Sequence, residues 1–99
     1  IYEVATGETR GNHAHRKQHQ FLIMFSGTCR VQVDSGVIRN SIEMDKPSQA
    51  IYVPPLNWLV LSDFSPNAVC GVLASDKYEE ADYIRNYDEF RSLTHGRSL

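Results

Sequence analysis

Short stretches of alternating apolar and polar residues limit what this chain can fold into. In the stretch TCRVQVD, the apolar residues Cys29, Val31 and Val33 alternate with polar ones. A period of two over this length is typical of a strand with one buried face and one solvated face. The preceding run QFLIMF (residues 20–25) is almost continuously apolar and also has the length of a strand. The pattern therefore predicts a protein built from short strands.

Turn-forming residues separate these stretches about every ten residues. Asp34-Ser35-Gly36, Lys46-Pro47-Ser48 and Pro54-Pro55 are the clearest breaks. Ser26-Gly27 is expected to connect the strands on either side of it as a hairpin. Further strands are expected at residues 37–44, 51–53, 58–61 and 68–73. This spacing predicts an all-β fold, an antiparallel sandwich or barrel.

The pattern changes after Ser75. Tyr83, Ile84, Tyr87 and Phe90 lie at helical spacing. Asp76 and Glu79 precede them as a capping pair would, within an acidic run. The sequence therefore predicts one short C-terminal helix with a solvated acidic start.

Length and composition exclude several classes of protein. The 99 residues make a single domain (1–99), and 10 basic against 12 acidic residues give a net charge of −2, which argues against a nucleic-acid partner. No apolar run approaches the ~20 residues that a membrane span needs. Cys29 and Cys70 are expected to be free, buried thiols of a cytoplasmic protein. Because the chain starts at Ile1 and not at Met, we expect a preceding segment.

Histidine is the unusual residue type in this composition, since three of the four histidines lie in the segment RGNHAHRKQHQ. On a strand, His13 and His15 would project from the same face, about 7 Å apart. Such a pair can hold a metal ion, transfer protons, or form hydrogen bonds on an exposed hairpin. The role of His19 stays open, and His95 in the polar tail is expected to have none.

The spacing of the histidine pair resembles the first metal-binding motif of cupins, in which an acceptor and a glycine follow at the positions of Gln20 and Gly27. A carboxylate would be expected where this chain has Gln20, and an amide is a poorer ligand for a divalent ion. The second motif would place its histidine at Leu59, in PPLNWL, and leucine has no donor atom. We therefore expect no metal and no other cofactor.

Proton transfer remains as the chemistry of the pair. Imidazole titrates near pH 6.5, so it can remove and return protons at neutral pH. Arg10 lies three residues before His13 and can supply positive charge for an anionic intermediate or a phosphate.

Several motifs together resemble one known family. They are RGNHAH, with Tyr2 and Gly7 upstream and Gln20 downstream, followed by YVPPLNW, DFSPNAV and LASDKYEEADYIRNYDEF. The combination resembles the sugar 3,4-ketoisomerases of the WxcM-like cupins, which act on dTDP-4-keto-6-deoxyglucose, and it covers nearly the whole chain. The resemblance implies a cupin or jelly-roll antiparallel barrel with a short C-terminal helix, and a metal-independent isomerase.

The resemblance also implies roles for individual residues. His15 would be the principal base and His13 its partner, in an order that the sequence leaves open, and Tyr2 would donate a proton to a sugar oxygen. The base would remove the proton at C3, and reprotonation of the enediolate at C4 would leave the ketone at C3. The implied substrate-binding residues are Arg10, Gln20 and Trp58, the last either stacked on thymine or filling the barrel.

The resemblance implies a dTDP-linked 4-keto-6-deoxy sugar as substrate and a segment before Ile1 that includes a strand exchanged between subunits. A barrel without its first strand has an open edge, so we expect a homodimer, and the free cysteines indicate the cytoplasm. The reaction would supply a deoxysugar for surface polysaccharide such as lipopolysaccharide. Three alternatives stay open: an epimerase on the same class of substrate, a non-catalytic sugar-nucleotide binding module, and a metal-binding cupin. Leu59 departs from the polar residue that many relatives have at this position, which puts a third polar group on that strand in doubt.

Overall fold

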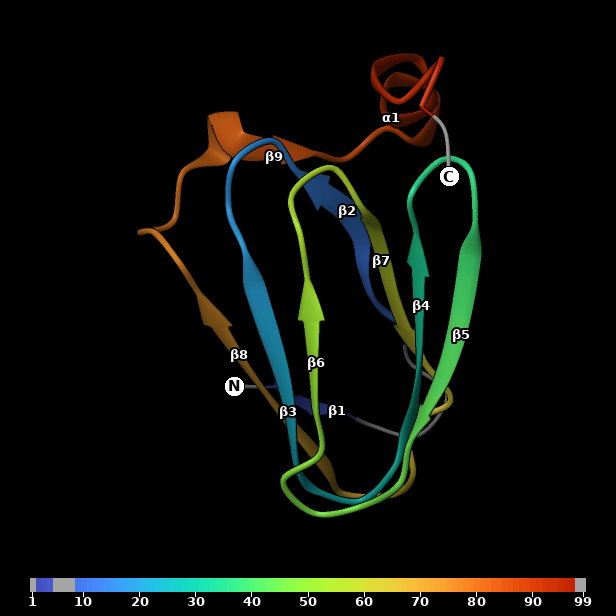
Figure 1. The fold of residues 1–99 in the computed structure, drawn as a ribbon. Helices are drawn as coiled ribbons and strands as arrows, with labels where there is room; N and C mark the ends of the chain where they lie inside the picture. Colours follow the sequence, from blue (N-terminus) through green and yellow to red (C-terminus); the bar gives the residue numbers. More distant parts are fainter. Residues whose placement is uncertain (1, 5–8, 98–99) are drawn as a thin grey trace.

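Two antiparallel sheets make up the computed structural model, which describes residues 2–4 and 9–97 (Figure 1). Its elements are β1 (Tyr2–Val4), β2 (Arg10–His15), β3 (Gln20–Ser26), β4 (Cys29–Asp34), β5 (Arg39–Met44), β6 (Ala50–Val53), β7 (Trp58–Ser62), β8 (Ala68–Ala74), η1 (Glu80–Asp82), β9 (Tyr83–Ile84) and α1 (Tyr87–Leu93). One sheet has the order β1-β8-β3-β6, and the other has the order β5-β4-β7-β2-β9.

The predicted all-β architecture with a short C-terminal helix is confirmed. Each of the six strands expected between residues 20 and 74 is present within two residues of its expected bounds. The two sheets do not close into the expected barrel, because within the described residues no strand pairs with a strand of the other sheet. The fold is therefore an open sandwich whose inner faces share one core.

Apolar side chains from both sheets fill the space between them. Leu22 and Met24 of β3 and Val31 of β4 are fully buried there, and burial of each such side chain stabilises the fold by about 1.5–3 kcal/mol. Cys29 and Cys70 are buried in the same cluster as free thiols, as the sequence predicted. The whole cluster comprises Leu22, Met24, Cys29, Val31, Met44, Val53, Leu59, Leu61, Phe64, Ala68 and Cys70.

The hairpin expected at Ser26-Gly27 is wrong. β3 pairs with β6 and β8, whereas β4 pairs with β5 and β7, so the chain crosses there from one sheet to the other. Gly27 has a φ of 77°, and a Cβ atom at this position would lie 2.9 Å from the Cα of Ala68. Only glycine allows this close approach to the other strand. The turn at Asp34-Ser35-Gly36 does form a hairpin, since Asp34 pairs with Arg39.

The C-terminal helix starts later than the sequence predicted. Residues 80–82 form the 3-10 helix η1, Tyr83–Ile84 form strand β9, and α1 is capped by Asn86, which accepts a hydrogen bond from the Glu89 amide at 3.0 Å. Asp82 is buried and accepts hydrogen bonds from backbone amides, so this part of the acidic run is not a solvated helix start. No helix in the described residues is long and apolar enough to cross a membrane.

A one-residue bulge in β2 determines which side chains enter the space between the sheets. Gly11 pairs with Val60 and His13 pairs with Leu59, so Asn12 is an extra residue. Gly11 and Asn12 both adopt positive φ, 89° and 57°. Because side chains alternate along a strand, this extra residue turns His13 to the face that an uninterrupted strand would give to Asn12.

We predict that Gly11→Ala destabilises the fold more than Gly96→Ala does. Both glycines have φ near 87°, at 89° and 85°, so both substitutions incur the left-handed backbone cost of about 1–2 kcal/mol. Only at Gly11 would the new Cβ collide with backbone, 2.7 Å from the Leu59 carbonyl oxygen, whereas nothing lies within 4 Å at Gly96. Urea unfolding of both variants measures the difference, and equal losses would contradict the bulge geometry.

Candidate active site

The histidine pair faces the space between the sheets. Residues paired across two strands share a face, and His13 is paired with Leu59, which belongs to the core between the sheets. His15 lies two residues further along β2 and projects to the same side. The two imidazole rings approach edge to face with their centroids 5.0 Å apart.

Both imidazoles are buried and each has one unpaired nitrogen. His13 is 7% exposed and His15 is 4% exposed. The Nε2 atoms of both rings are buried without a hydrogen-bond partner. An unsatisfied buried polar atom is costly to the fold, so two of them side by side indicate a site kept for a ligand.

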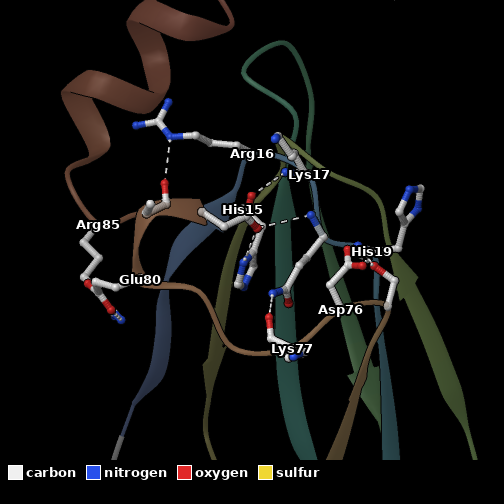
Figure 2. Close-up of polar contacts among 12 residues, drawn as sticks. His15, Arg16, Lys17, His19, Asp76, Lys77, Glu80 and Arg85 are labelled. Atoms are coloured by element: carbon white, nitrogen blue, oxygen red, sulfur yellow. Dashed lines mark hydrogen bonds and ion pairs between the residues drawn. The ribbon is translucent and has the colours of Figure 1, made fainter.

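The other nitrogen of each ring has a different partner. His15 Nδ1 lies 3.1 Å from Oδ2 of Asp82, from the C-terminal segment (Figure 2). His13 forms a hydrogen bond with the backbone of Gly11, its neighbour across the bulge. One histidine is therefore held by a carboxylate and the other by a neutral backbone group.

Burial keeps the histidines neutral. Desolvation and the neighbouring His15 lower the pKa of His13 from 6.5 to about 4. Desolvation also lowers the pKa of His15, although the hydrogen bond and charge of Asp82 oppose it. Burial raises the pKa of Asp82, but hydrogen bonds from the amides of Gln18 and Lys17, together with the contact to His15, lower that pKa below its ordinary value. At neutral pH the site thus holds two neutral imidazoles and one carboxylate.

Tyr83 and Arg85 complete the wall around the pair. The Tyr83 ring lies 4.3 Å from the His15 ring and 5.1 Å from the His13 ring, between centroids. The Arg85 guanidinium stacks on Tyr83, 4.2 Å from the ring centroid, and pairs with Glu80 at 2.9 Å. Its charge contributes to the low pKa of both histidines. The site therefore has a cation at its edge.

Of the predicted residues Gln20, Arg10 and Tyr2, the structure places only the first at the same end of the sandwich as His15. Gln20 is buried at the start of β3, on the inward face that it shares with Leu22, and four residues separate it from His15. Arg10 lies at the opposite end of β2 from His15, where its guanidinium donates to the Thr9 carbonyl at 3.3 Å. The backbone of Tyr2 pairs with Cys70, but its side chain lies outside the described residues.

Trp58 lies on the other face of the five-stranded sheet. It precedes Leu59 in β7 and so points away from the histidines, and its ring packs against Tyr87 and Phe90 of the C-terminal helix. A cavity of about 280 Å³ lies on that outer face, lined by Asn12, Gln32, Asp34, Arg39, Trp58, Val60 and Tyr87. The structure therefore does not bring Trp58 together with the histidine pair.

His19 also lies apart from the pair. It is exposed, its ring stacks on that of Tyr52, and its Nδ1 atom lies 2.5 Å from the Tyr52 hydroxyl. Figure 2 shows it directed away from His15.

The donor set around His13 does not fit a divalent metal ion. Leu59, at the position of the fourth cupin ligand, is the cross-strand partner of His13 and offers only methyl groups. Gln20 offers a neutral amide. Among the described residues, no three His, Cys, Asp or Glu side chains are grouped so that they could hold a metal ion.

Sequence reasoning missed Asp82, Tyr83 and Arg85. All three lie in the motif LASDKYEEADYIRNYDEF, whose residues after Ser75 are predicted to form one short helix. The apolar spacing of Tyr83 and Ile84 fits a helix as well as a strand, because two residues are too few to establish a period. Their pairing with His15 and Ala14 depends on a contact 68 to 70 residues apart in sequence.

The fold and the site define an antiparallel β-sandwich of the cupin type with a buried histidine pair. The FdtA family, described as WxcM-like, C-terminal, matches residues 1–95. The chain belongs to this family, as its motifs predicted.

One curated relative shares most of this chain. The chain is 46% identical over 91 residues to the TDP-4-oxo-6-deoxy-alpha-D-glucose-3,4-oxoisomerase of Aneurinibacillus thermoaerophilus. The aligned region covers 92% of this chain and 66% of the relative. The chain thus spans slightly less than two thirds of that relative's length.

Solved structures of sugar 3,4-ketoisomerases have the same fold as this chain. The sugar 3,4-ketoisomerase QdtA of Thermoanaerobacterium thermosaccharolyticum, in complex with TDP, matches with a TM-score of 0.92 and 39% identity, over 100% of this chain and 72% of its own. A 3,4-ketoisomerase of Helicobacter canadensis matches with a TM-score of 0.89 and 37% identity, over 95% and 71%. The 3'-monoepimerase ChmJ of Streptomyces bikiniensis, at 18% identity and a TM-score of 0.75 over 83% and 47%, shares the fold alone.

We predict that the protein loses stability as the pH falls from about 6.5 towards 4. In the unfolded chain histidine titrates near 6.5, whereas His13 titrates at about 4 in the fold, so the unfolded state binds more protons in this window. The slope contributed by each such histidine is at most about 1.4 kcal/mol per pH unit. Urea unfolding at a series of pH values measures it.

The control for this prediction is a second histidine. His13→Asn removes the buried group and makes the dependence shallower, whereas His95→Asn, at an exposed position, leaves it unchanged. Unfolding free energies that are flat between pH 6.5 and 4 would contradict the burial of a neutral His13.

Proposed function

We propose that this chain catalyses the 3,4-ketoisomerisation of a dTDP-linked 4-keto-6-deoxyhexose. The observation that carries the proposal is the pair of buried imidazoles whose Nε2 atoms lack partners, within a member of this family. A His→Asn variant of QdtA was solved with TDP-4-keto-6-deoxyglucose, which supports the same class of ligand for this site.

The proposed reaction moves one carbon-bound proton. His15 takes the proton from C3 at its free Nε2 atom, and the electrons of the C–H bond form the C3–C4 double bond of an enediolate. The carbonyl π electrons pass to the C4 oxygen, which takes up the proton that the C3 hydroxyl loses. The protonated His15 then returns a proton to C4, so that the ketone stands at C3 and a hydroxyl at C4. His13, neutral at this pH, accepts a hydrogen bond from a sugar hydroxyl. General acid–base catalysis of this kind contributes about 10²–10⁴-fold to a rate.

A single incubation tests the proposal. With dTDP-4-keto-6-deoxyglucose in deuterated water, NMR is expected to show a 3-keto sugar carrying deuterium at C4. Deuterium at the original carbon without movement of the ketone would favour the epimerase instead. Binding of the sugar nucleotide with no exchange and no product would favour the non-catalytic module, and either result would overturn the proposal.

We predict that His15→Asn reduces turnover at least about 100-fold, because the amide cannot accept the proton. His19→Asn is the matched control, since His19 lies on the surface against Tyr52 and is expected to keep full activity. Circular dichroism confirms that both variants fold. An active His15→Asn variant would show that the proton acceptor is another group.

We further propose that the protein is a cytoplasmic homodimer whose product serves surface polysaccharide. The unpaired thiols of Cys29 and Cys70 support a reducing compartment, and the family resemblance supports the polysaccharide role. An apolar patch on the outer face of the four-stranded sheet supports the dimer. Phe21 is paired with Tyr52 on one side and Leu73 on the other, and all three are exposed, Leu73 to 61%.

We predict that Leu73→Glu lowers the mass measured by light scattering from that of a dimer to that of a monomer, because it places a charge in the apolar patch. Leu93→Glu adds the same charge at an exposed position of α1 and is expected to leave the mass unchanged. A wild-type protein that is monomeric at all concentrations would contradict the dimer.

A further inference from the structure

Asp82 connects the C-terminal segment to the histidine pair through three hydrogen bonds to its carboxylate. Its Oδ2 lies 3.1 Å from Nδ1 of His15 and accepts from the Gln18 amide at 3.2 Å. Its Oδ1 accepts from the Lys17 amide at 2.8 Å. The side chain is buried, so it is a carboxylate with three fixed partners and little solvent.

We propose that Asp82 is a positioning residue that makes His15, and not His13, the proton acceptor of the site. This inference rests on the proposed function, since it assigns a role within the same reaction. The carboxylate accepts the proton on Nδ1, which leaves the lone pair of His15 on Nε2. That nitrogen is the buried, unpartnered one.

The backbone on both sides holds the carboxylate in this place. The Arg16 amide donates to the Asp82 carbonyl at 2.9 Å, and the Asp82 amide donates to the Glu79 carbonyl at 3.0 Å. Immediately after Asp82, the strand β9 pairs Tyr83 with His15. The carboxylate and the imidazole therefore belong to two backbone segments that are hydrogen-bonded to each other on either side of the contact.

His13 lacks such a partner. Its ring is held by the backbone of Gly11, a neutral group that cannot balance the charge of an imidazolium. When a histidine takes a proton from carbon, an adjacent carboxylate stabilises the cation that forms. Burial and the neighbouring His15 lower the pKa of His13 to about 4, so a proton on this ring is held weakly at neutral pH. The two histidines thus have different roles because their second nitrogens have different partners.

Other charged groups near the pair act against protonation. The guanidinium of Arg85, on the segment after β9, lowers the pKa of both rings, and His15 lowers that of His13. Tyr83 contributes an aromatic face, without charge, to both rings. Among the described groups around His15, Asp82 is the one that raises its pKa, by its hydrogen bond and its charge.

The tautomer of His15 tests the geometry without any substrate. In two-bond proton–nitrogen NMR spectra of the ¹⁵N-labelled chain, His15 is expected to carry its proton on Nδ1 and its lone pair on Nε2. Asp82→Asn is expected to abolish this preference, because its amide can donate to Nδ1 as well as accept. Glu79→Gln, which removes a neighbouring exposed carboxylate that caps nothing, is the matched control and leaves the spectrum unchanged.

Kinetics tests the role. Asp82→Asn is expected to lower kcat by about 100-fold or more while KM changes less than about threefold, as for a residue that acts through the base. In a His15→Asn background, Asp82→Asn is expected to lower kcat little further, because Asp82 acts only through His15. Glu79→Gln is expected to keep wild-type rates.

The outcomes separate this inference from the proposed function. A wild-type His15 protonated on Nε2 would overturn the inference, and that spectrum decides even where Asp82→Asn fails to fold. Full activity of a folded Asp82→Asn variant would also overturn it. The expected tautomer in a wild-type chain without isomerase activity would overturn the proposed function and leave the Asp82–His15 geometry confirmed.

Discussion

The site depends on the single extra residue in β2. If β2 ran without the bulge, Asn12 would oppose Leu59 and His13 would oppose Trp58, so both histidines would lie on the outer face beneath the helix. The bulge reverses this alternation at Asn12 and turns the imidazoles inward. Gly11 makes the bulge possible, because its Cβ-less backbone lies against the Leu59 carbonyl. The face of the sheet on which the two histidines lie is thus set by the backbone conformation at Gly11 and Asn12.

Burial of two imidazoles side by side would destabilise the fold if either carried a charge. Both therefore remain neutral, with pKa values below that of free histidine. A buried imidazole can take up a proton only if the resulting positive charge is stabilised. A carboxylate hydrogen-bonded to the other ring nitrogen provides this stabilisation. The fold supplies that carboxylate through Asp82 in the C-terminal segment, whose own pKa is kept low by two backbone amides.

The sequence predicted the parts of this structure that depend on local pattern. Period-two alternation located the strands, and the spacing of His13 and His15 placed them on one face. The sequence pattern could not show that the chain crosses between the sheets at Ser26-Gly27, because a tight glycine turn is compatible with a hairpin and with a crossing. The spacing of Tyr83 and Phe90 suggested one helix, whereas pairing with β2 divides the segment into a strand and a helix. Pairing between strands that are distant in sequence determined both the crossing and the C-terminal strand, and local residue propensities do not predict such pairing.

The two faces of β2 have different tasks. The inner face carries the histidine pair, and the outer face anchors the C-terminal segment that carries Asp82. Ala14, between the two histidines, points outward and is buried with Trp58, Ile84 and Phe90. This apolar cluster anchors β9 and α1 to the sheet, and Asp82 lies directly before β9. Trp58 therefore contributes to the site from the opposite face, by fixing the segment that carries the carboxylate to His15. The same alternation that turns His13 and His15 to the inner side of the strand turns Ala14 to the outer side, where it helps to hold the segment that carries Asp82.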